Sequence, residues 1–266
     1  MSAEIPKRYF EKIALHICDF HVHVGQFKGL YFSPAEIVKK LKKLGISRWA
    51  VSSTSTCDRD FNFEKVKQEI LEMMALAPEQ TLPVLWISPE MLEASKDLKK
   101  YDILPFVAFK IHGISHKWDP KGKSLRRVFH IARERNIPLL IHTGGSPDTE
   151  SGVYAVVCSQ FPDVIVILAH GRPVNQAITV MKRCQNTRVD TAFMPIEDIK
   201  QIVASGLSDR ILFGTDFPID KYFYPKQSEI SRYKNRVNTL VKTFGEKTFL
   251  KWANAKTIGC KEERKL

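Results

Sequence analysis

Short, almost entirely apolar segments alternate along the chain with longer segments whose apolar residues recur at helical spacing. Residues 164–169 read as a strand buried on both faces, because all six are apolar. By contrast, Ile37, Val38, Leu41 and Leu44 recur every three or four residues, which is the spacing of one face of a helix. The pattern therefore predicts buried strands that alternate with amphipathic helices.

One of these helices carries clear signals at both ends. Ser33 and Glu36 have the spacing of a capping box, with Pro34 at the first helical position. Gly45 follows the last apolar residue of the helix and is the residue type that most readily ends one. The sequence thus predicts a helix that begins after Ser33 and ends before Gly45.

The same alternation covers the whole chain. Strands are expected at residues 15–22, 46–51, 82–87, 106–111, 138–142, 164–169, 187–192 and 210–215. Helices are expected after each strand, with the later ones at 62–77, 90–101, 124–135, 151–160, 174–185 and 196–205. Eight strand–helix units in 266 residues predict a (β/α)8 TIM barrel that forms a single domain over residues 1–266.

The competing architecture is an open, doubly wound sheet. That fold binds its ligand at a glycine-rich turn after an early strand, and the sequence contains neither a GxGxxG motif nor a P-loop. No composition shift or linker marks an internal boundary. The barrel is therefore the favoured architecture.

Polar residues follow several of the predicted strands at the point where each strand ends. In a TIM barrel the reactive groups lie at these carboxyl ends. The residues concerned are Asp19, His21, His23, Lys110, His112, His142, His170, Arg172 and Asp216. Side chains alternate along a strand, so Asp19, His21 and His23 are expected to face the same way.

Histidine and aspartate at strand ends indicate a metal site. Neutral imidazole and carboxylate are ligands for zinc, manganese and iron, and a catalytic site keeps one position for water. The residue types therefore predict a divalent ion and leave zinc, manganese and iron open. A single histidine at a strand end is more often structural, so the prediction depends on the whole set.

These segments resemble the amidohydrolase superfamily, and within it the amidohydrolase-related (amidohydrolase 2) branch of metal-dependent TIM-barrel hydrolases and decarboxylases. The matching segments are DFHVH at 19–23, PLLIHTGG at 138–145, ILAHGR at 167–172, ILFGTDFP at 211–218 and the ending at 252–255. Each segment alone is short, but their order and number make the resemblance specific. It spans nearly the whole chain.

The resemblance implies a role for each candidate residue. His21, His23 and His142 would bind the metal. Asp216 would bind the metal and accept a proton from the attacking water. His170 would bind a second metal or, without one, orient water and polarise the substrate.

Three further residues are assigned less directly. Lys110 lies where two-metal members of the superfamily carry a carbamylated lysine, which would make it a bridging ligand and part of the catalytic machinery. The branch that this chain resembles is often mononuclear, so the resemblance implies one or two ions per chain, with zinc favoured and manganese or iron as alternatives. Arg172 and His112 are candidates for substrate binding, Arg172 because its guanidinium matches a substrate carboxylate.

The resemblance implies a hydrolase that uses metal-activated water on a small carboxylated, lactone, ester or amide substrate. A non-oxidative decarboxylase on the same scaffold is the alternative, because both reactions use the same ligands. A third alternative, a non-catalytic basic barrel associated with nucleic acid, is disfavoured by the complete ligand set.

Composition and charge refine this picture. Hydrophobic residues make up 44% and charged residues 26%, which is typical of a globular protein. The net charge is +12, but residues 221–266 contribute +8 of it on expected helices, so an anionic small-molecule substrate is favoured over nucleic acid.

The remaining expectations concern compartment and assembly. We expect a cytoplasmic protein without a membrane partner, because the sequence has no membrane span and no apparent secretory signal. The five cysteines suggest no disulfide framework. A homo-oligomer stays open.

Overall fold

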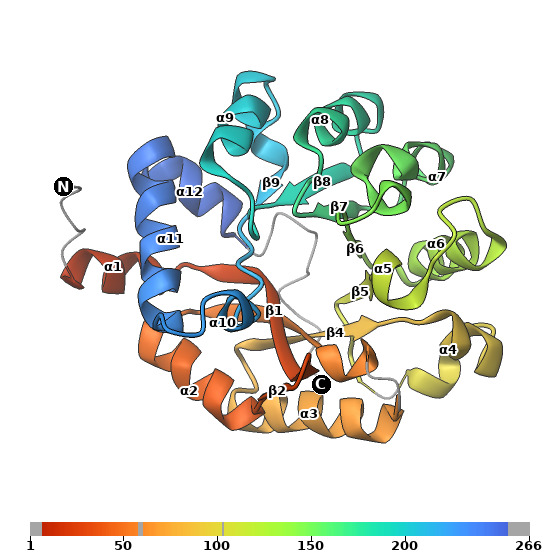
Figure 1. Ribbon diagram of the computed structural model, residues 1–266, viewed down its shortest axis with the longest axis horizontal. Coiled ribbons are helices and arrows are strands. Elements are labelled where there is room, and N and C mark those ends of the chain that lie inside the picture. Colours follow the sequence, from red (N-terminus) through yellow and green to blue (C-terminus); the bar gives the residue numbers. More distant parts are fainter. Residues whose placement is uncertain (1–6, 58–60, 103, 255–266) are drawn as a thin grey trace. The chain divides into compact units, whose positions relative to one another are not determined.

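The computed structural model describes residues 7–57, 61–102 and 104–254. Strands and helices alternate along the chain as the sequence predicts (Figure 1). The chain divides into one unit of Met1–Leu82 with Leu212–Leu266 and a second of Pro83–Ile211. The single domain over residues 1–266 stays a prediction, and Ala255 and Cys260 lie outside the described residues.

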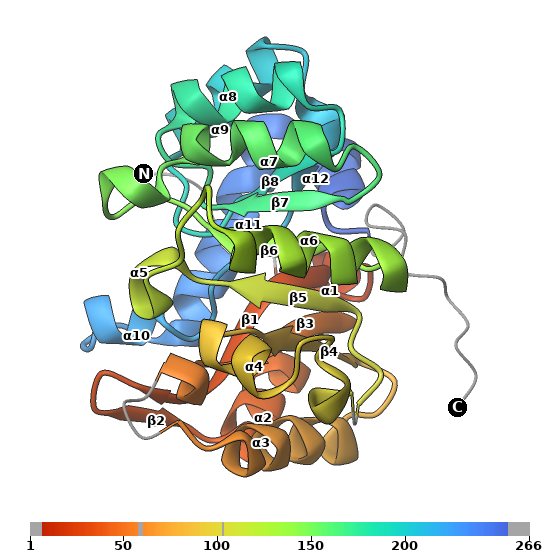
Figure 2. The same ribbon diagram turned by 90° about the vertical axis from the view of Figure 1, so that its right-hand side faces the viewer.

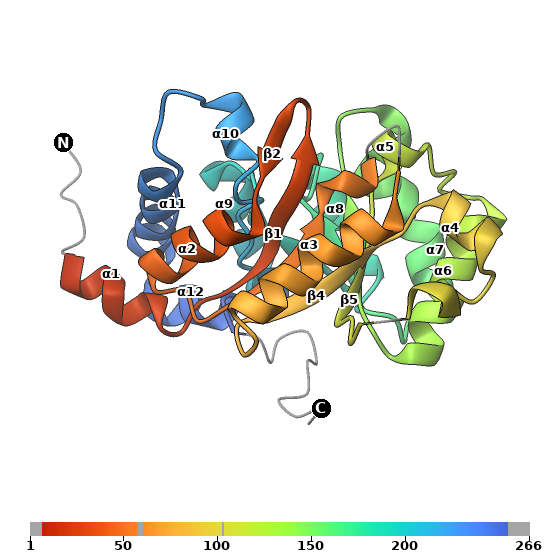
Figure 3. The ribbon, with the colours of Figure 1, turned by 90° about the horizontal axis from the view of Figure 1, so that it is seen from below.

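The first unit is organised around strand β1 (Cys18–Phe27). It pairs in parallel with β3 (Arg48–Ser53) and antiparallel with β2 (Leu30–Phe32). Helices α2 (Pro34–Leu44) and α3 (Phe63–Leu76) lie side by side in this unit (Figure 3). Its other elements are α1 (Lys7–Ala14), η1 (Thr54–Cys57), α10 (Asp220–Phe223), α11 (Glu229–Phe244) and α12 (Glu246–Trp252).

The chain returns to β1 after the short strand β9 (Ile211–Leu212). The backbone N–H of Phe20 donates to Phe213 O at 2.9 Å, and that of His23 donates to Phe217 O at 2.7 Å. Val22 and Phe217 form a parallel bridge. The segment before Phe217 therefore lies along β1, which brings Asp216 beside the histidines of β1.

The second unit contains a parallel sheet. Strands β5 (Ala108–Ile111), β6 (Leu139–His142), β7 (Val166–Ala169) and β8 (Thr187–Asp190) pair in order, and β5 also pairs with β4 (Thr81–Trp86). All four residues of β7 are buried, as its apolar sequence predicts. Because the strands are parallel, their carboxyl ends lie at the same edge of the sheet.

Helices cover this sheet, and α6 and α7 lie on the same side of it (Figure 2). The helices of the second unit are α4 (Pro89–Ala94), α5 (Gly113–His116), α6 (Lys123–Arg135), α7 (Ala155–Gln160), α8 (Val174–Arg183) and α9 (Ile196–Ala204). Its 3-10 turns are η2 (Lys99–Tyr101), η3 (Pro147–Thr149), η4 (Ser151–Tyr154) and η5 (Ser208–Arg210).

The predicted helix at 90–101 is interrupted. Helix α4 ends at Ala94, and a 3-10 turn follows at Lys99–Tyr101. The carboxylate of Asp97 accepts a hydrogen bond from the backbone N–H of Lys99, and Leu98 adopts a left-handed φ of 60°. Both features favour a turn over a continuous helix.

Two further expectations are corrected. Helix α2 begins at Pro34 and Gly45 ends it in the left-handed conformation, as predicted, but the Ser33 hydroxyl makes no capping hydrogen bond. The predicted strand at 15–22 lies further along the chain and extends into a hairpin with β2. Gly25, at a φ of 91°, lies on that extension.

Candidate metal centre

Strand β1 carries the first two candidate ligands. His21 and His23 are buried, with 1% and 2% of their surfaces exposed, and their rings meet edge to face with centroids 5.0 Å apart. The register of β1 on β3 shifts between Asp19 and Val22, so the strict alternation expected from Asp19 onward is interrupted. The two histidines nevertheless both reach the same carboxylate.

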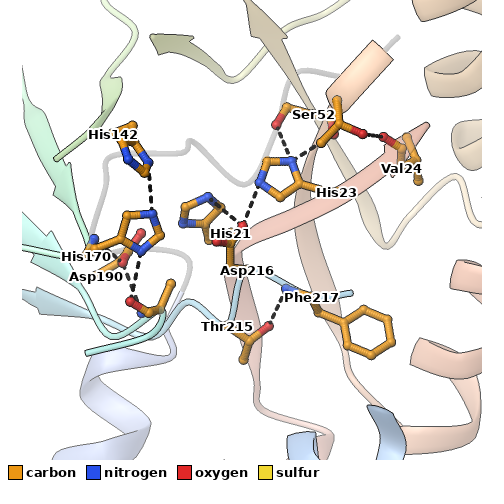
Figure 4. A network of polar contacts seen from close by, with 12 residues as sticks. His21, His23, Val24, Ser52, His142, His170, Asp190, Thr215, Asp216 and Phe217 are labelled. Carbon is orange, nitrogen blue, oxygen red and sulfur yellow. Dashed lines mark hydrogen bonds and ion pairs between the residues drawn. The ribbon is translucent and has the colours of Figure 1, made fainter. Parts of the chain in front are cut away.

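That carboxylate belongs to Asp216, which follows β9. Its Oδ1 atom lies 2.8 Å from Nε2 of His23 and 3.4 Å from Nε2 of His21 (Figure 4). Asp216 is 7% exposed and has a left-handed φ of 61°, a conformation that non-glycine residues rarely adopt. Two imidazole nitrogens and one carboxylate oxygen thus converge in a buried position.

The donor set fits a divalent ion. Nδ1 of His23 lies 3.2 Å from the carbonyl oxygen of Ser52, which can only accept, so Nδ1 carries the proton. Nε2 of a neutral His23 then presents a lone pair to an anionic oxygen 2.8 Å away. Only a cation between these two atoms, a proton or a metal ion, makes that approach favourable, and the ligand types are those of zinc sites.

Asp19 supports this group without joining it. It is fully buried, and its carboxylate accepts hydrogen bonds from the Thr215 hydroxyl at 2.6 Å and from the backbone N–H of His21 at 3.0 Å. Burial raises the pKa of Asp19 to about 7, while hydrogen bonds from Thr215, His21 and Tyr233 act in the opposite direction. Asp19 thus ties β1 to the residue that precedes Asp216.

The second unit brings together two other candidate ligands. Nε2 of His170 lies 3.1 Å from Nδ1 of His142. Nδ1 of His170 lies 3.0 Å from the carbonyl oxygen of Ala192, so it carries the proton and leaves a lone pair on Nε2. Asp190 holds the turn, because its carboxylate accepts from the backbone N–H groups of His170 and Ala192, both at 3.0 Å.

Lys110 and His112 both lie against the ring of Trp86 in the second unit. The ring of His112 lies between those of Trp86 and His142, with centroid distances of 5.4 and 3.9 Å. Lys110 is 1% exposed, and its Nζ lies 5.4 Å from the centre of the Trp86 ring. The predicted roles of Lys110 as a bridging carbamate and of His112 in substrate binding stay predictions.

Arg172 is fixed by its backbone and partly by its side chain. Its N–H donates to the Thr143 hydroxyl at 2.9 Å, and Nη2 donates to Phe193 O at 3.0 Å. Its alkyl chain lies where a side chain at Gly144 would be, since an added Cβ would lie 2.7 Å from Arg172 Cβ. The guanidinium is therefore held in place, while its role towards a substrate stays a prediction.

The structure brings the predicted residues together in two groups. His21, His23 and Asp216 meet in the first unit, and Lys110, His112, His142 and His170 gather in the second. That the two groups share an ion is a prediction from the sequence. The roles of Ser52, Asp190 and Thr215 were not predicted from the sequence, although Thr215 directly precedes Asp216 and Ser52 begins a run of five hydroxyl residues.

A family comparison agrees with this geometry. The family model of the amidohydrolases matches residues 18–238. The chain belongs to the amidohydrolase family. The resemblance inferred from the sequence is therefore confirmed, and membership supports an enzyme of the amidohydrolase superfamily.

Solved structures of similar shape confirm the fold class. An uncharacterised TIM-barrel protein from Bordetella bronchiseptica is 19% identical with a TM-score of 0.65, over 91% of this chain and 97% of that chain. A zinc-bound amidohydrolase from Burkholderia multivorans is 9% identical with a TM-score of 0.63, over 89% and 96%. The amidohydrolase has the predicted (β/α)8 fold.

A third similar structure, from Acinetobacter baumannii, bears the name of a probable 2-pyrone-4,6-dicarboxylic acid hydrolase and has citric acid bound. It is 10% identical with a TM-score of 0.62, over 88% of this chain and 95% of that chain. None of the curated proteins matches the sequence. Within residues 7–57, 61–102 and 104–254, no helix combines the length and apolar character needed to cross a membrane.

Proposed function

We propose that this amidohydrolase is a metal-dependent hydrolase of a small anionic substrate, such as a carboxylated lactone, ester or amide. The observation that carries the proposal is the convergence of His21 Nε2 and His23 Nε2 on Asp216 Oδ1, at 3.4 and 2.8 Å, in a buried position. A divalent ion bound there would polarise the substrate carbonyl and lower the pKa of a water molecule.

In the proposed reaction the residues move protons and orient the substrate. Asp216 accepts the proton that water loses as its oxygen bonds to the carbonyl carbon. It then returns this proton to the leaving oxygen or nitrogen as the bond to that atom breaks. No oxidant or further reactant is needed, since water supplies both the nucleophile and the proton.

Three residues of the second unit are proposed to act at the metal site. We assign His142 as a third ligand, and His170 as a ligand of a second ion or as a group that orients water and polarises the substrate. The proton on Nδ1 of His170 supports either role, because it places the lone pair of the neutral ring on Nε2, which lies 3.1 Å from Nδ1 of His142. Lys110 would bridge the ions if there are two.

The charge of the molecule supports an anionic substrate. The net charge of +12 raises the local concentration of anions. Arg172 is proposed to bind a substrate carboxylate through its guanidinium, and His112 to donate from Nε2. His112 Nδ1 accepts from the backbone N–H of Ser115 at 3.2 Å, so in the neutral ring the proton lies on Nε2.

The metal content of the purified protein is the first test. Protein prepared without chelator is compared by elemental analysis with the double variant His21→Ala/His23→Ala. The variant His130→Ala, which changes an exposed histidine of α6, is the matched control. We expect metal in the wild type and the control, and its loss in the double variant.

The number of ions separates the two forms of the site. About two ions per chain would support a bridging carbamate on Lys110, and about one would support a mononuclear site. No metal, even after reconstitution with zinc or manganese, would contradict the proposed function.

A substrate screen tests the reaction itself. Carboxylated lactones, esters and amides are incubated with the metal-loaded protein, and product acid and carbon dioxide are measured together. Acid without carbon dioxide supports the hydrolase. Carbon dioxide release from an aromatic or dienoic acid would instead identify a decarboxylase on the same scaffold.

A further inference from the structure

The second ring nitrogen of His23 is held by a neighbouring strand. Residues His23 and Ser52 are direct partners in the parallel register of β1 and β3. Nδ1 of His23 lies 3.2 Å from Ser52 O and 3.1 Å from Ser52 Oγ. A single residue thus places two oxygen atoms at the edge of the ring opposite Asp216 (Figure 4).

The backbone carbonyl alone does not fix the direction of the ring. One acceptor at 3.2 Å defines a long hydrogen bond, and the ring can tilt about it. The hydroxyl oxygen supplies a second acceptor for the same N–H, so the ring is held from two points. Ser52 is 3% exposed, so water does not readily replace its hydroxyl.

The hydroxyl groups that follow Ser52 in the chain, at residues 53–56, donate to other partners. The hydroxyls of Ser53 and Ser55 donate to the buried carboxylate of Glu69. Thr54 Oγ1 donates to Val24 O at 2.8 Å. These contacts fix the end of β3, where Ser52 lies, and Thr54 offers a control hydroxyl of similar burial two residues away.

We propose that Ser52 is a positioning residue that keeps the proton of His23 on Nδ1 and directs the Nε2 lone pair towards Asp216 and the ion. The inference rests on the proposed function only for its effect on metal affinity. Its effect on the ring belongs to the protein without metal. A group that orients a histidine ligand in this way typically changes metal affinity by about 10- to 100-fold.

The direct test is the protonation state of His23 in the metal-free protein. Long-range proton–nitrogen NMR of histidine-labelled protein distinguishes a ring protonated on Nδ1 from one protonated on Nε2, and the variant His23→Gln identifies the signal. We expect Nδ1 to carry a proton in the wild type; without an ion, a second proton can lie between Nε2 and Asp216 Oδ1, which are 2.8 Å apart. A wild-type His23 without a proton on Nδ1 would overturn the inference without any variant of Ser52.

Three variants of the hydroxyl run extend the test. We expect Ser52→Ala to give a mixture of the two ring forms and to weaken zinc binding by about 10-fold in a competition titration with a chelator. Ser52→Thr keeps the hydroxyl and should restore the wild-type ring form. Thr54→Val removes a buried hydroxyl from the same run and should leave the ring form unchanged.

The outcomes separate this inference from the proposed function. If Ser52→Ala keeps the wild-type ring form and zinc affinity, the inference is wrong while the metal site stands. If the wild type binds no metal but Ser52→Ala still alters the ring form, the proposed function fails and the positioning of His23 stands. Unfolding of Ser52→Ala would leave the wild-type spectrum and Ser52→Thr to decide.

Discussion

In the first unit two histidines turn towards a carboxylate, whereas in the second unit the histidines contact one another and a tryptophan. His21 and His23 share Oδ1 of Asp216, while His142 meets His170 and stacks on His112. The carboxylate of Asp190 accepts from the backbone N–H groups of His170 and Ala192. The first group can therefore hold a cation by charge, and the second offers neutral ligands and donors.

The two groups also differ in what fixes their rings. His23 and His170 each direct Nδ1 to a backbone carbonyl, at Ser52 and Ala192. His112 does the opposite, because its Nδ1 accepts from a backbone N–H. The backbone partner determines which ring nitrogen keeps a lone pair. In the neutral ring that nitrogen is Nε2 in His23 and His170, and Nδ1 in His112.

Removing the carboxylate should abolish the main difference between the groups. We expect Asp216→Asn to fold normally and to lower turnover by at least ~10²-fold, because the variant loses both a proton acceptor and an anionic ligand. Turnover of the substrate found in the screen and bound metal are measured together. Asp148→Asn, at an exposed aspartate, is the control. Full activity of Asp216→Asn would contradict its assigned role.

A smaller effect is expected from a substitution at Gly25, which lies on β1 beyond His23. At Gly25 an added Cβ would lie 2.6 Å from Ser55 Oγ and 2.7 Å from Glu69 Oε2, at a φ of 91°. We expect Gly25→Ala to lower the free energy of unfolding by about 3 kcal/mol, through both strain and crowding.

Gly29 provides the matched control for that substitution. Its φ is 85°, but nothing lies within 4 Å of an added Cβ. Gly29→Ala should cost about 1 kcal/mol from strain alone. Urea unfolding of both variants measures the difference, and equal losses would show that crowding at Gly25 is unimportant.

The hydrogen bond between Thr215 and Asp19, next to Asp216, should contribute less to stability. Thr215→Val removes the hydroxyl that donates to the buried Asp19 at 2.6 Å, and we expect a loss of about 1–3 kcal/mol in unfolding free energy. Thr239→Val, at an exposed helical threonine, should change stability by less than about 0.5 kcal/mol. Thermal unfolding measures the stability of both variants. Equal stability would mean that the hydrogen bond from Thr215 to Asp19 does not stabilise the fold.

The smallest expected effect compares thiols of the two units. Cys158 in the second unit is fully buried, and burial raises its pKa, so little reactive thiolate forms. Cys57 in the first unit is partly exposed. We expect iodoacetamide at mildly alkaline pH to modify Cys57 at least about 10-fold faster, as measured by peptide mass spectrometry. Equal rates in the folded protein would contradict the burial of Cys158.

Much of the fold was predictable because strands β5, β6 and β7 of the second unit are short and mainly apolar. Residues 164–169 could only be a buried strand in this context, and β7 lies within them. The interruption at Leu98 and the hairpin with β2 were not predicted, because both depend on turn contacts rather than on periodicity.

By itself, the sequence determined the alternation of elements, the fold class, the family and the list of candidate ligands at the strand ends. These follow from residue type and spacing along one chain. Only the tertiary structure decided that Asp216 turns to His21 and His23 through a left-handed backbone conformation, and that Ser52 holds His23. Hydrogen bonds between residues far apart in the sequence set these orientations, and such bonds leave no periodic signal along the chain.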